Sequence, residues 1–141
     1  LDANTGSILK EQPVGSSVNV CGPPTVDGDW IYYPTASKGV VALDKNTMEV
    51  KNTYATDTTL LYTAPYVRDN AQTVESSPIL LGDWLVFSAL DGALYVYEKN
   101  TAELVRKIQV GAPLIAKPIV LGDAFYVADF EGNLSKYYIT K

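Results

Sequence analysis

The stretch that decides the fold reads Pro78-Ile79-Leu80-Leu81-Gly82-Asp83-Trp84-Leu85-Val86-Phe87. Residues 24–33 and 118–127 repeat its pattern. In each copy a proline precedes a short apolar run, a Gly-Asp pair follows, and a second apolar run comes after it. The first prolines of the copies lie 54 and 40 residues apart. Repetition at such a spacing indicates a repeat architecture.

Each copy continues into two more strands. Asp91-Gly92 and Glu131-Gly132 are hairpin turn signals, and Lys38-Gly39 is a weaker equivalent. After the third strand, an Asn-Thr pair turns the chain into a fourth strand, at Asn46-Thr47 and Asn100-Thr101. Four antiparallel strands with short turns, in about forty residues, are typical of a β-propeller blade. The predicted fold class is therefore all-β, a partial propeller or part of a larger ring.

The pattern predicts strands at nine places: 24–27, 30–35, 40–44, 78–81, 84–89, 93–98, 118–121, 124–128 and 133–138. A β-sandwich with evenly spaced strands is the alternative fold. Three copies of the same turns favour the propeller over the sandwich.

The repeat also predicts the organisation of the chain as a single propeller segment. Residues 1–20 contain strand D of a preceding or closing blade, around Ser7 to Gln12. Blades follow at 24–52 and 78–110, and residues 118–141 form a blade without a clear strand D. Residues 53–77 are an inserted connection, because the first spacing exceeds a blade by about 14 residues.

The chain opens at Leu1 in the middle of a repeat, so we expect a fragment or a processed product. An arc of three blades would expose two open sides with apolar strand surface. The sequence therefore predicts self-association, or a companion segment that completes the propeller.

Composition excludes several classes of function. The net charge of −5 argues against nucleic-acid binding, which needs a basic face. Histidine, the commonest general base and metal ligand, is absent. The single cysteine, Cys21, can form no internal disulfide and is expected as a small buried residue. No apolar run approaches the ~18 residues needed to span a bilayer.

The inserted connection holds the candidate binding residues. It carries aromatic and polar groups that the blade pattern does not require, among them Tyr62, Tyr66, Arg68 and Asn70. Loops that exceed their structural need often carry function, and Tyr and Arg are enriched in binding hot spots. Glu75 and Lys117 fall just before a first strand, near the mouth of a channel. These residues predict a protein or small ligand on the loop face; packing on the rim is the alternative.

Other conspicuous residues fit structural roles. The acids of Asp27-Gly28-Asp29, Gly82-Asp83 and Gly122-Asp123 sit one or two to a turn, whereas calcium needs six to eight converging oxygens. Trp30 and Trp84 could stack on a sugar or aromatic ligand, but they occupy the same repeat position, which favours blade packing or a rim position. We therefore expect no metal site, no catalytic residues and no cofactor.

The residues from Asp91 to Tyr97, with the turns at 1–6 and 41–47, resemble the quinoprotein-type or PQQ-like β-propeller repeat. The resemblance covers almost the whole chain except residues 53–74. In that family a tryptophan often follows the turn and docks neighbouring blades; Lys10, Asn52 and Arg106 stand there in this chain. The cofactor-binding members also use adjacent cysteines and acidic calcium ligands, so the resemblance here is to the non-catalytic branch.

That resemblance implies a non-catalytic module for protein or ligand binding or scaffolding, as in periplasmic lipoproteins that scaffold outer-membrane protein assembly. One alternative that it implies is the accessory propeller of a secreted bacterial hydrolase such as a metallophosphoesterase. A quinone-dependent dehydrogenase is a third reading, which the single cysteine disfavours. A periplasmic or extracellular location also rests on the resemblance alone.

Overall fold

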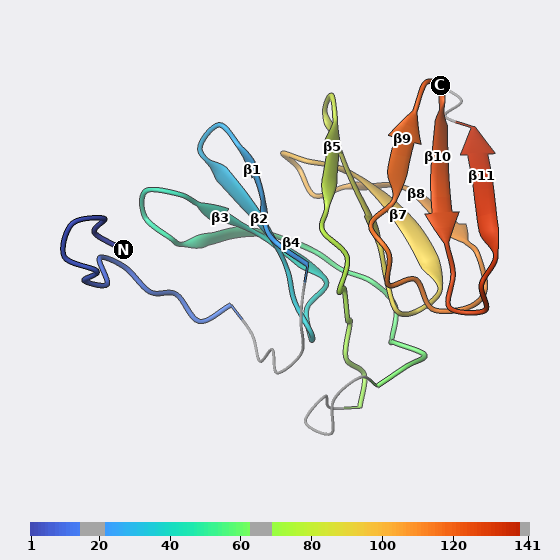
Figure 1. The fold of residues 1–141 in the computed structure, drawn as a ribbon, viewed down its shortest axis with the longest axis horizontal. Coiled ribbons are helices and arrows are strands. Elements are labelled where there is room, and N and C mark those ends of the chain that lie inside the picture. The colour runs from blue at the N-terminus through green and yellow to red at the C-terminus, as the bar shows by residue number, and fades with distance from the viewer. Residues whose placement is uncertain (15–21, 63–68, 139–141) are drawn as a thin grey trace.

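The computed structural model describes residues 1–14, 22–62 and 69–138. Their eleven strands form three successive antiparallel sheets (Figure 1). Blade 1 contains β1 (Thr25–Asp27), β2 (Trp30–Pro34), β3 (Val40–Asp44) and β4 (Val50–Tyr54). Blade 2 contains β5 (Ile79–Leu81), β6 (Trp84–Ser88), β7 (Ala93–Glu98) and β8 (Leu104–Gln109). Blade 3 contains β9 (Ile119–Leu121), β10 (Ala124–Ala128) and β11 (Leu134–Tyr138).

The fold-class prediction is confirmed, and a strand lies at each of the nine predicted places. The register between the second and third strands is the same in all three blades, as the sequence repeat predicts. Trp30 pairs with Asp44 in blade 1, Trp84 with Glu98 in blade 2, and Ala124 with Tyr138 in blade 3. A bulge shifts the register between Ala42 and Leu43, and another shifts it at the equivalent place between Val96 and Tyr97. The sheets are consecutive along the chain and stand side by side, as blades do (Figure 1).

The turn that contains the Asn-Thr pair is built in the same way three times. In blade 1 the Asp44 carboxylate accepts hydrogen bonds from the backbone N–H groups of Asn46 and Thr47, both 2.8 Å long. Glu98 does the same for Asn100 and Thr101 in blade 2. Near the N-terminus, Asp2 holds Asn4 and Thr5 in this way. An acidic side chain followed by Asn-Thr is therefore the local signal that fixes this turn.

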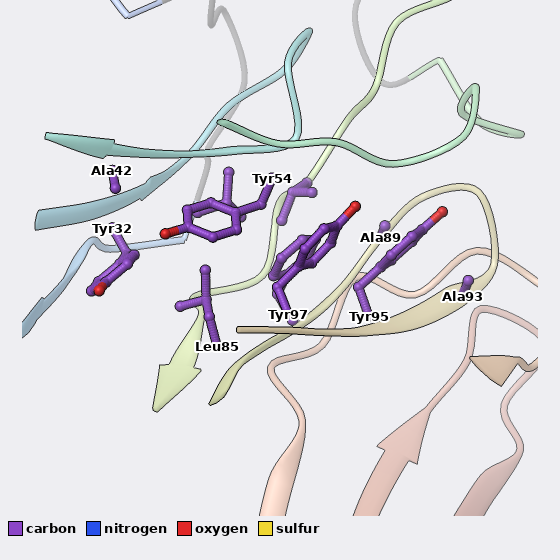
Figure 2. Close-up of a cluster of buried hydrophobic side chains, with 11 residues drawn as sticks. Tyr32, Ala42, Tyr54, Leu85, Ala89, Ala93, Tyr95 and Tyr97 are labelled. Carbon is purple, nitrogen blue, oxygen red and sulfur yellow. The ribbon is translucent and has the colours of Figure 1, made fainter. Parts of the chain in front are cut away.

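Blade 2 is buried on both faces. One face packs Leu85, Phe87, Tyr95 and Tyr97 against blade 1, including Tyr54. The rings of Tyr54 and Tyr97 meet edge to face at 5.5 Å (Figure 2). Tyr97 also stacks on Phe87 at 5.9 Å. The other face of blade 2 packs against blade 3. This double burial explains why β6 and β7 read as nearly continuous apolar runs.

Blades 1 and 2 are also joined by polar contacts at the position where the resembling family carries tryptophan. The Asn52 side-chain amide donates a 2.9 Å hydrogen bond to the Asn100 carbonyl in the next blade's turn. The Lys10 ammonium donates at 3.2 Å to the Asn46 carbonyl, which is the equivalent atom in blade 1. At two of the three positions where the resembling family carries tryptophan, a polar side chain therefore makes this contact. The residue at this position reaches the following blade through a hydrogen bond.

Two boundaries differ from the sequence expectation. Strand β4 runs to Tyr54, two residues into the expected insertion. Residues 7–12 form no strand, although we expected strand D of another blade there. A fourth strand needs the free edge of a third strand, and β3 already pairs with β4. Among the described residues, no helix has the length and apolarity needed to cross a bilayer.

Candidate functional site

The first half of the inserted connection is anchored on blade 2. The backbone N–H of Asp57 donates to two acceptors, the Asp91 carboxylate at 3.0 Å and the Tyr95 hydroxyl oxygen at 2.9 Å. The Tyr97 hydroxyl donates to the Ala55 carbonyl at 2.5 Å. The N–H of Leu60 donates to the Leu90 carbonyl in the turn between β6 and β7. The connection therefore lies across the edge of blade 2 where that turn emerges.

Asp91 is the buried centre of this anchor. Its carboxylate accepts from the Tyr95 hydroxyl at 2.5 Å and from the Ala93 N–H at 3.1 Å, besides Asp57. Burial raises the pKa of the Asp91 carboxyl, and the hydrogen bonds from Tyr95 and the backbone oppose that rise. Burial and the bond to Asp91 likewise raise the pKa of the Tyr95 hydroxyl. With its oxygens committed to three donors, this carboxyl serves to hold the connection in place.

A surface ion pair completes the anchor. The Lys107 ammonium lies 2.5 Å from the Asp57 carboxylate and 5.7 Å from the centre of the Tyr95 ring. Sequence reasoning assigned Asp91 only to a turn and missed this cluster. The available signal was the combination of an acidic residue in the turn with tyrosines four and six residues later, at Asp91, Tyr95 and Tyr97. Only the blade that follows the insertion has this combination.

The connection displays side chains beyond its anchor. A hydrogen bond from the Thr59 N–H to the Ala71 carbonyl, 2.9 Å long, joins its two arms. Leu60 is 61% exposed and Tyr62 is 47% exposed. Asn70 is exposed on the returning arm and has a φ of 69°, which asparagine tolerates better than most residues. Tyr66 and Arg68, the other two predicted residues of this group, lie outside the described residues.

The returning arm is more structural than the sequence indicated. Ala71 and Val74 are buried, and Val74 belongs to the core between blades 1 and 2. The Thr73 hydroxyl donates at 2.8 Å to the Ala36 carbonyl of blade 1. Among the described residues of the insertion, the arm from Ala71 to Ser77 is therefore buried or partly buried, whereas the exposed residues lie before it, in 55–62 and at 69–70.

Glu75 and Lys117 lie at different blade junctions. Glu75 is partly buried, and its carbonyl accepts a 2.6 Å hydrogen bond from the Gly22 N–H between blades 1 and 2. Lys117 is exposed and lines a groove of about 520 Å³ between the first strands of blades 2 and 3. The other groove residues are apolar: Ile79, Leu80, Leu81, Pro118, Ile119 and Val120. The two residues that we expected together near the mouth of a channel therefore lie apart, Glu75 between blades 1 and 2 and Lys117 at the groove between blades 2 and 3.

The turn acids take structural roles where the structure gives them partners. Asp27 pairs with Lys99 at 2.8 Å, which ties blade 1 to blade 2, and Asp29 pairs with Lys45 at 2.9 Å. In the described ranges, no group of three or more acidic, histidine or cysteine side chains is arranged to hold a metal ion. Trp30 and Trp84 are partly buried against the two cores, in agreement with blade packing. Cys21 lies outside the described residues.

Comparison with solved structures shows the β-propeller fold. BamB from Moraxella catarrhalis matches with a TM-score of 0.65 at 21% identity, over 83% of this chain and 33% of that one. The β-propeller domain of Cps50 (Swd1) from Myceliophteria thermophila matches at 0.64 and 17% identity, over 86% and 36%. A europium-containing methanol dehydrogenase matches at 0.64 and 19% identity, over 84% and 23%.

The chain therefore spans about a third or less of the length of these propellers. Identities of this size establish the shared fold and no shared activity. No protein-family model and no curated protein sequence matches the chain.

Proposed function

We propose that this chain is a non-catalytic propeller module that binds a protein partner on its loop face. The loop face is the edge of the blades that carries the inserted connection and the turn between β6 and β7. The observation that supports this most directly is the pair of exposed apolar side chains, Leu60 and Tyr62, on an anchored segment. Exposed apolar groups that gather on one element mark interaction sites more often than scattered ones do.

The anchor gives such a contact surface a thermodynamic advantage. Asp91, Tyr95 and Tyr97 fix the backbone up to Asp57, and the Thr59–Ala71 hydrogen bond closes the base of the segment. A segment held in this way loses less conformational freedom on binding than a free loop, so more of the contact energy appears as affinity. The sequence adds Tyr66 and Arg68 to the same segment, and Arg68 suits a partner carboxylate.

The proposal includes no chemistry by this chain. The sequence lacks histidine, and Asp91, the buried acid of the anchor, is committed to structural donors. We place the module in the periplasm or outside the cell, as the resemblance to PQQ-like repeats implies. An accessory role beside a secreted hydrolase is compatible with the same contact surface, since the partner would then be the enzyme portion.

The test compares two surface variants. A double variant, Leu60→Ser with Tyr62→Ser, removes the displayed side chains and leaves the anchor intact. The control, Leu104→Ser with Val105→Ser, removes two similarly exposed apolar groups from β8. Proteins captured from the source cells by the wild-type chain are identified, and the affinity of the purified partner is then measured by calorimetry.

Hot-spot truncations cost more than about 1 kcal/mol each, so the double variant should weaken binding at least tenfold. The control should bind like the wild type. Equal affinity of the double variant and the wild type would contradict the proposal.

A further inference from the structure

The first strand of blade 1 is joined to blade 2 by polar contacts. At one end of β1, the Thr25 hydroxyl donates a 2.5 Å hydrogen bond to the Pro78 carbonyl, just before β5. At the other end, the Asp27 carboxylate pairs with the Lys99 ammonium of blade 2 at 2.8 Å. Blade 1 is therefore bound to blade 2 through polar contacts at both ends of β1.

The same two positions are apolar at the junction of blades 2 and 3. Ile79 stands where blade 1 has Thr25, and Leu81 stands where blade 1 has Asp27. An isoleucine side chain has no hydroxyl to donate to the Pro118 carbonyl, and a leucine side chain forms no ion pair. The groove of about 520 Å³ lies at this junction, with β5 and β9 as its two walls. The change from polar to apolar residues at these two positions therefore coincides with the groove.

The groove has the size and the lining of a small-molecule site. Ligand pockets typically measure about 300–1,000 Å³ and are mostly apolar, with a few polar groups that fix the orientation of the ligand. Ile79, Leu81 and Val120 line this groove and are partly buried against the core between blades 2 and 3. Its walls are three residues long, which is roughly 10 Å at about 3.3 Å per residue. These dimensions suit a slender aliphatic chain.

Charge gives the groove a direction. Lys117 is exposed at one end, and no acidic side chain in the described part of the chain forms an ion pair with it. Asp83 and Asp123 stand in the turns at the other ends of β5 and β9. An anion is therefore attracted to the Lys117 end and repelled from the opposite end. Pro23 and Ser77 occupy the position of Lys117 in blades 1 and 2, so the cation comes at the junction that has the groove.

We propose that the groove between β5 and β9 binds a monocarboxylate with an unbranched aliphatic tail of medium length. The tail lies along Ile79, Leu81 and Val120, and the carboxylate pairs with the Lys117 ammonium. A second carboxylate on the ligand would lie against apolar side chains or beside the aspartate turns, so the site disfavours dicarboxylates. The site is separate from the protein-contact surface on the inserted connection, so either proposal can fail without the other.

Titration with octanoate tests the location of the site and its apolar lining. In methyl NMR spectra, the signals of Ile79, Leu81 and Val120 should shift and saturate together. The signals of Val50 and Leu104, which are exposed on β4 and β8, should not move. Hexanoate, which is two methylene groups shorter, should bind several-fold to roughly fifteenfold more weakly, because each buried methylene contributes about fourfold in affinity. Shifts spread over all exposed apolar residues, or equal affinities of hexanoate and octanoate, would overturn the proposal.

Reversal of the charge at Lys117 tests the orientation of the ligand. The wild-type chain should prefer octanoate to octylammonium, and Lys117→Glu should prefer octylammonium, because the tail contacts are the same and only the sign at the end of the groove changes. Lys51→Glu, at an exposed position of β4, is the control and should keep the wild-type preference. A Lys117→Glu variant that still prefers octanoate would refute the pairing of the carboxylate with Lys117.

A substitution copied from blade 1 tests the groove itself. Ile79→Thr supplies the hydroxyl that Thr25 uses at the other junction, which can draw the two walls together and places a polar group beside the aliphatic tail. Octanoate should then bind about tenfold more weakly or not at all. Ile79→Val resembles threonine in shape and lacks the hydroxyl, so it should lose about fourfold or less, the contribution of one methylene group. Equal losses in the two variants would show that closing the groove has no effect and would contradict the proposal.

Discussion

The hydroxyl of Tyr95 donates a 2.5 Å hydrogen bond to the carboxylate of Asp91, and both side chains are buried. The Tyr95 ring stacks on Phe87 at 5.6 Å in the core between blades 1 and 2. Because the same carboxylate accepts from the Asp57 N–H, the inserted connection is tied directly to that core. The insertion is thus part of the folded unit up to its anchor.

Asp91→Ala should destabilise the chain strongly. The substitution leaves the Tyr95 hydroxyl and the Ala93 N–H without their acceptor and the Asp57 N–H with the Tyr95 oxygen alone, and a buried unsatisfied group costs about 1–3 kcal/mol. We expect a loss of at least ~2 kcal/mol in urea unfolding, followed by Trp30 and Trp84 fluorescence at a fixed chain concentration. Asp129→Ala, at an exposed turn in blade 3, is the control and should lose less. Equal losses in the two variants would show that burial of the Asp91 cluster adds nothing.

Asp91 should also give the stability a distinct pH dependence. Burial raises the pKa of the Asp91 carboxyl, so this group binds a proton more readily in the folded chain than in the unfolded one. Its contribution is therefore fully present below the unfolded pKa of about 3.9 and is lost as pH rises through the folded pKa. The free energy of unfolding of the wild type relative to Asp91→Asn should fall as pH rises from about 4.

Asp44 provides the control of opposite sign. Hydrogen bonds from the Thr47 and Asn46 backbone hold the pKa of the Asp44 carboxyl below its usual range. Its contribution is present above the unfolded pKa and is lost as pH falls, so the wild type relative to Asp44→Asn should gain stability as pH rises. Parallel curves for the two comparisons would contradict the assignment of Asp91. Asp57, Lys107, Tyr95 and Tyr97 surround Asp91 and are unchanged in both comparisons.

Gly92→Ala should be far more damaging than Gly82→Ala. Both glycines have positive φ, 81° and 61°, so both substitutions incur the left-handed strain of about 1–2 kcal/mol. At Gly82 an added Cβ meets open space, whereas at Gly92 it collides with the carbonyl oxygen of Gly111. That carbonyl belongs to the connection after β8, so the collision cannot be relieved by a side-chain rotation. Unfolding midpoints in urea that shift equally for both variants would contradict the collision.

The fold was predictable because the repeat over-determines it. The proline, the Gly-Asp turn and the hairpin glycine recur in phase with the apolar runs, so each local preference agrees with the same four-stranded unit. The expected strand at residues 7–12 is the element that does not form. Their sequence favours a strand, but a strand forms only against an edge, and the edge available in blade 1 is taken by β4. Local sequence does not encode which edges remain free.

The candidate site was predictable only in part. The inserted connection was predictable because the first repeat is longer than a blade. Tyr62 and Asn70 are exposed, and their role in contact with a partner stays a prediction. The anchor was missed because Asp91 and Asp57 are 34 residues apart, and turn chemistry alone explained an Asp-Gly pair. Glu75 and Lys117 looked alike in sequence, yet they lie at different junctions, because blades 1 and 2 close tightly at Gly22 while a groove separates the first strands of blades 2 and 3.

Met48→Gly should stabilise the chain. The turn that contains the Asn-Thr pair needs a residue in the left-handed region, and its three copies place Gly6, Met48 and Ala102 there, with φ of 71°, 59° and 58°. Glycine takes this conformation without the clash between Cβ and the carbonyl that other residues suffer, which costs them about 1–2 kcal/mol. Glycine's greater freedom in the unfolded chain offsets part of that gain, so we expect about 0.5–1 kcal/mol in urea unfolding. Met48→Ala keeps the strain and removes most of the side chain, so it is the matched control and should not stabilise. If Met48→Ala stabilised as much as Met48→Gly, the gain would come from removing the methionine side chain and not from the backbone conformation.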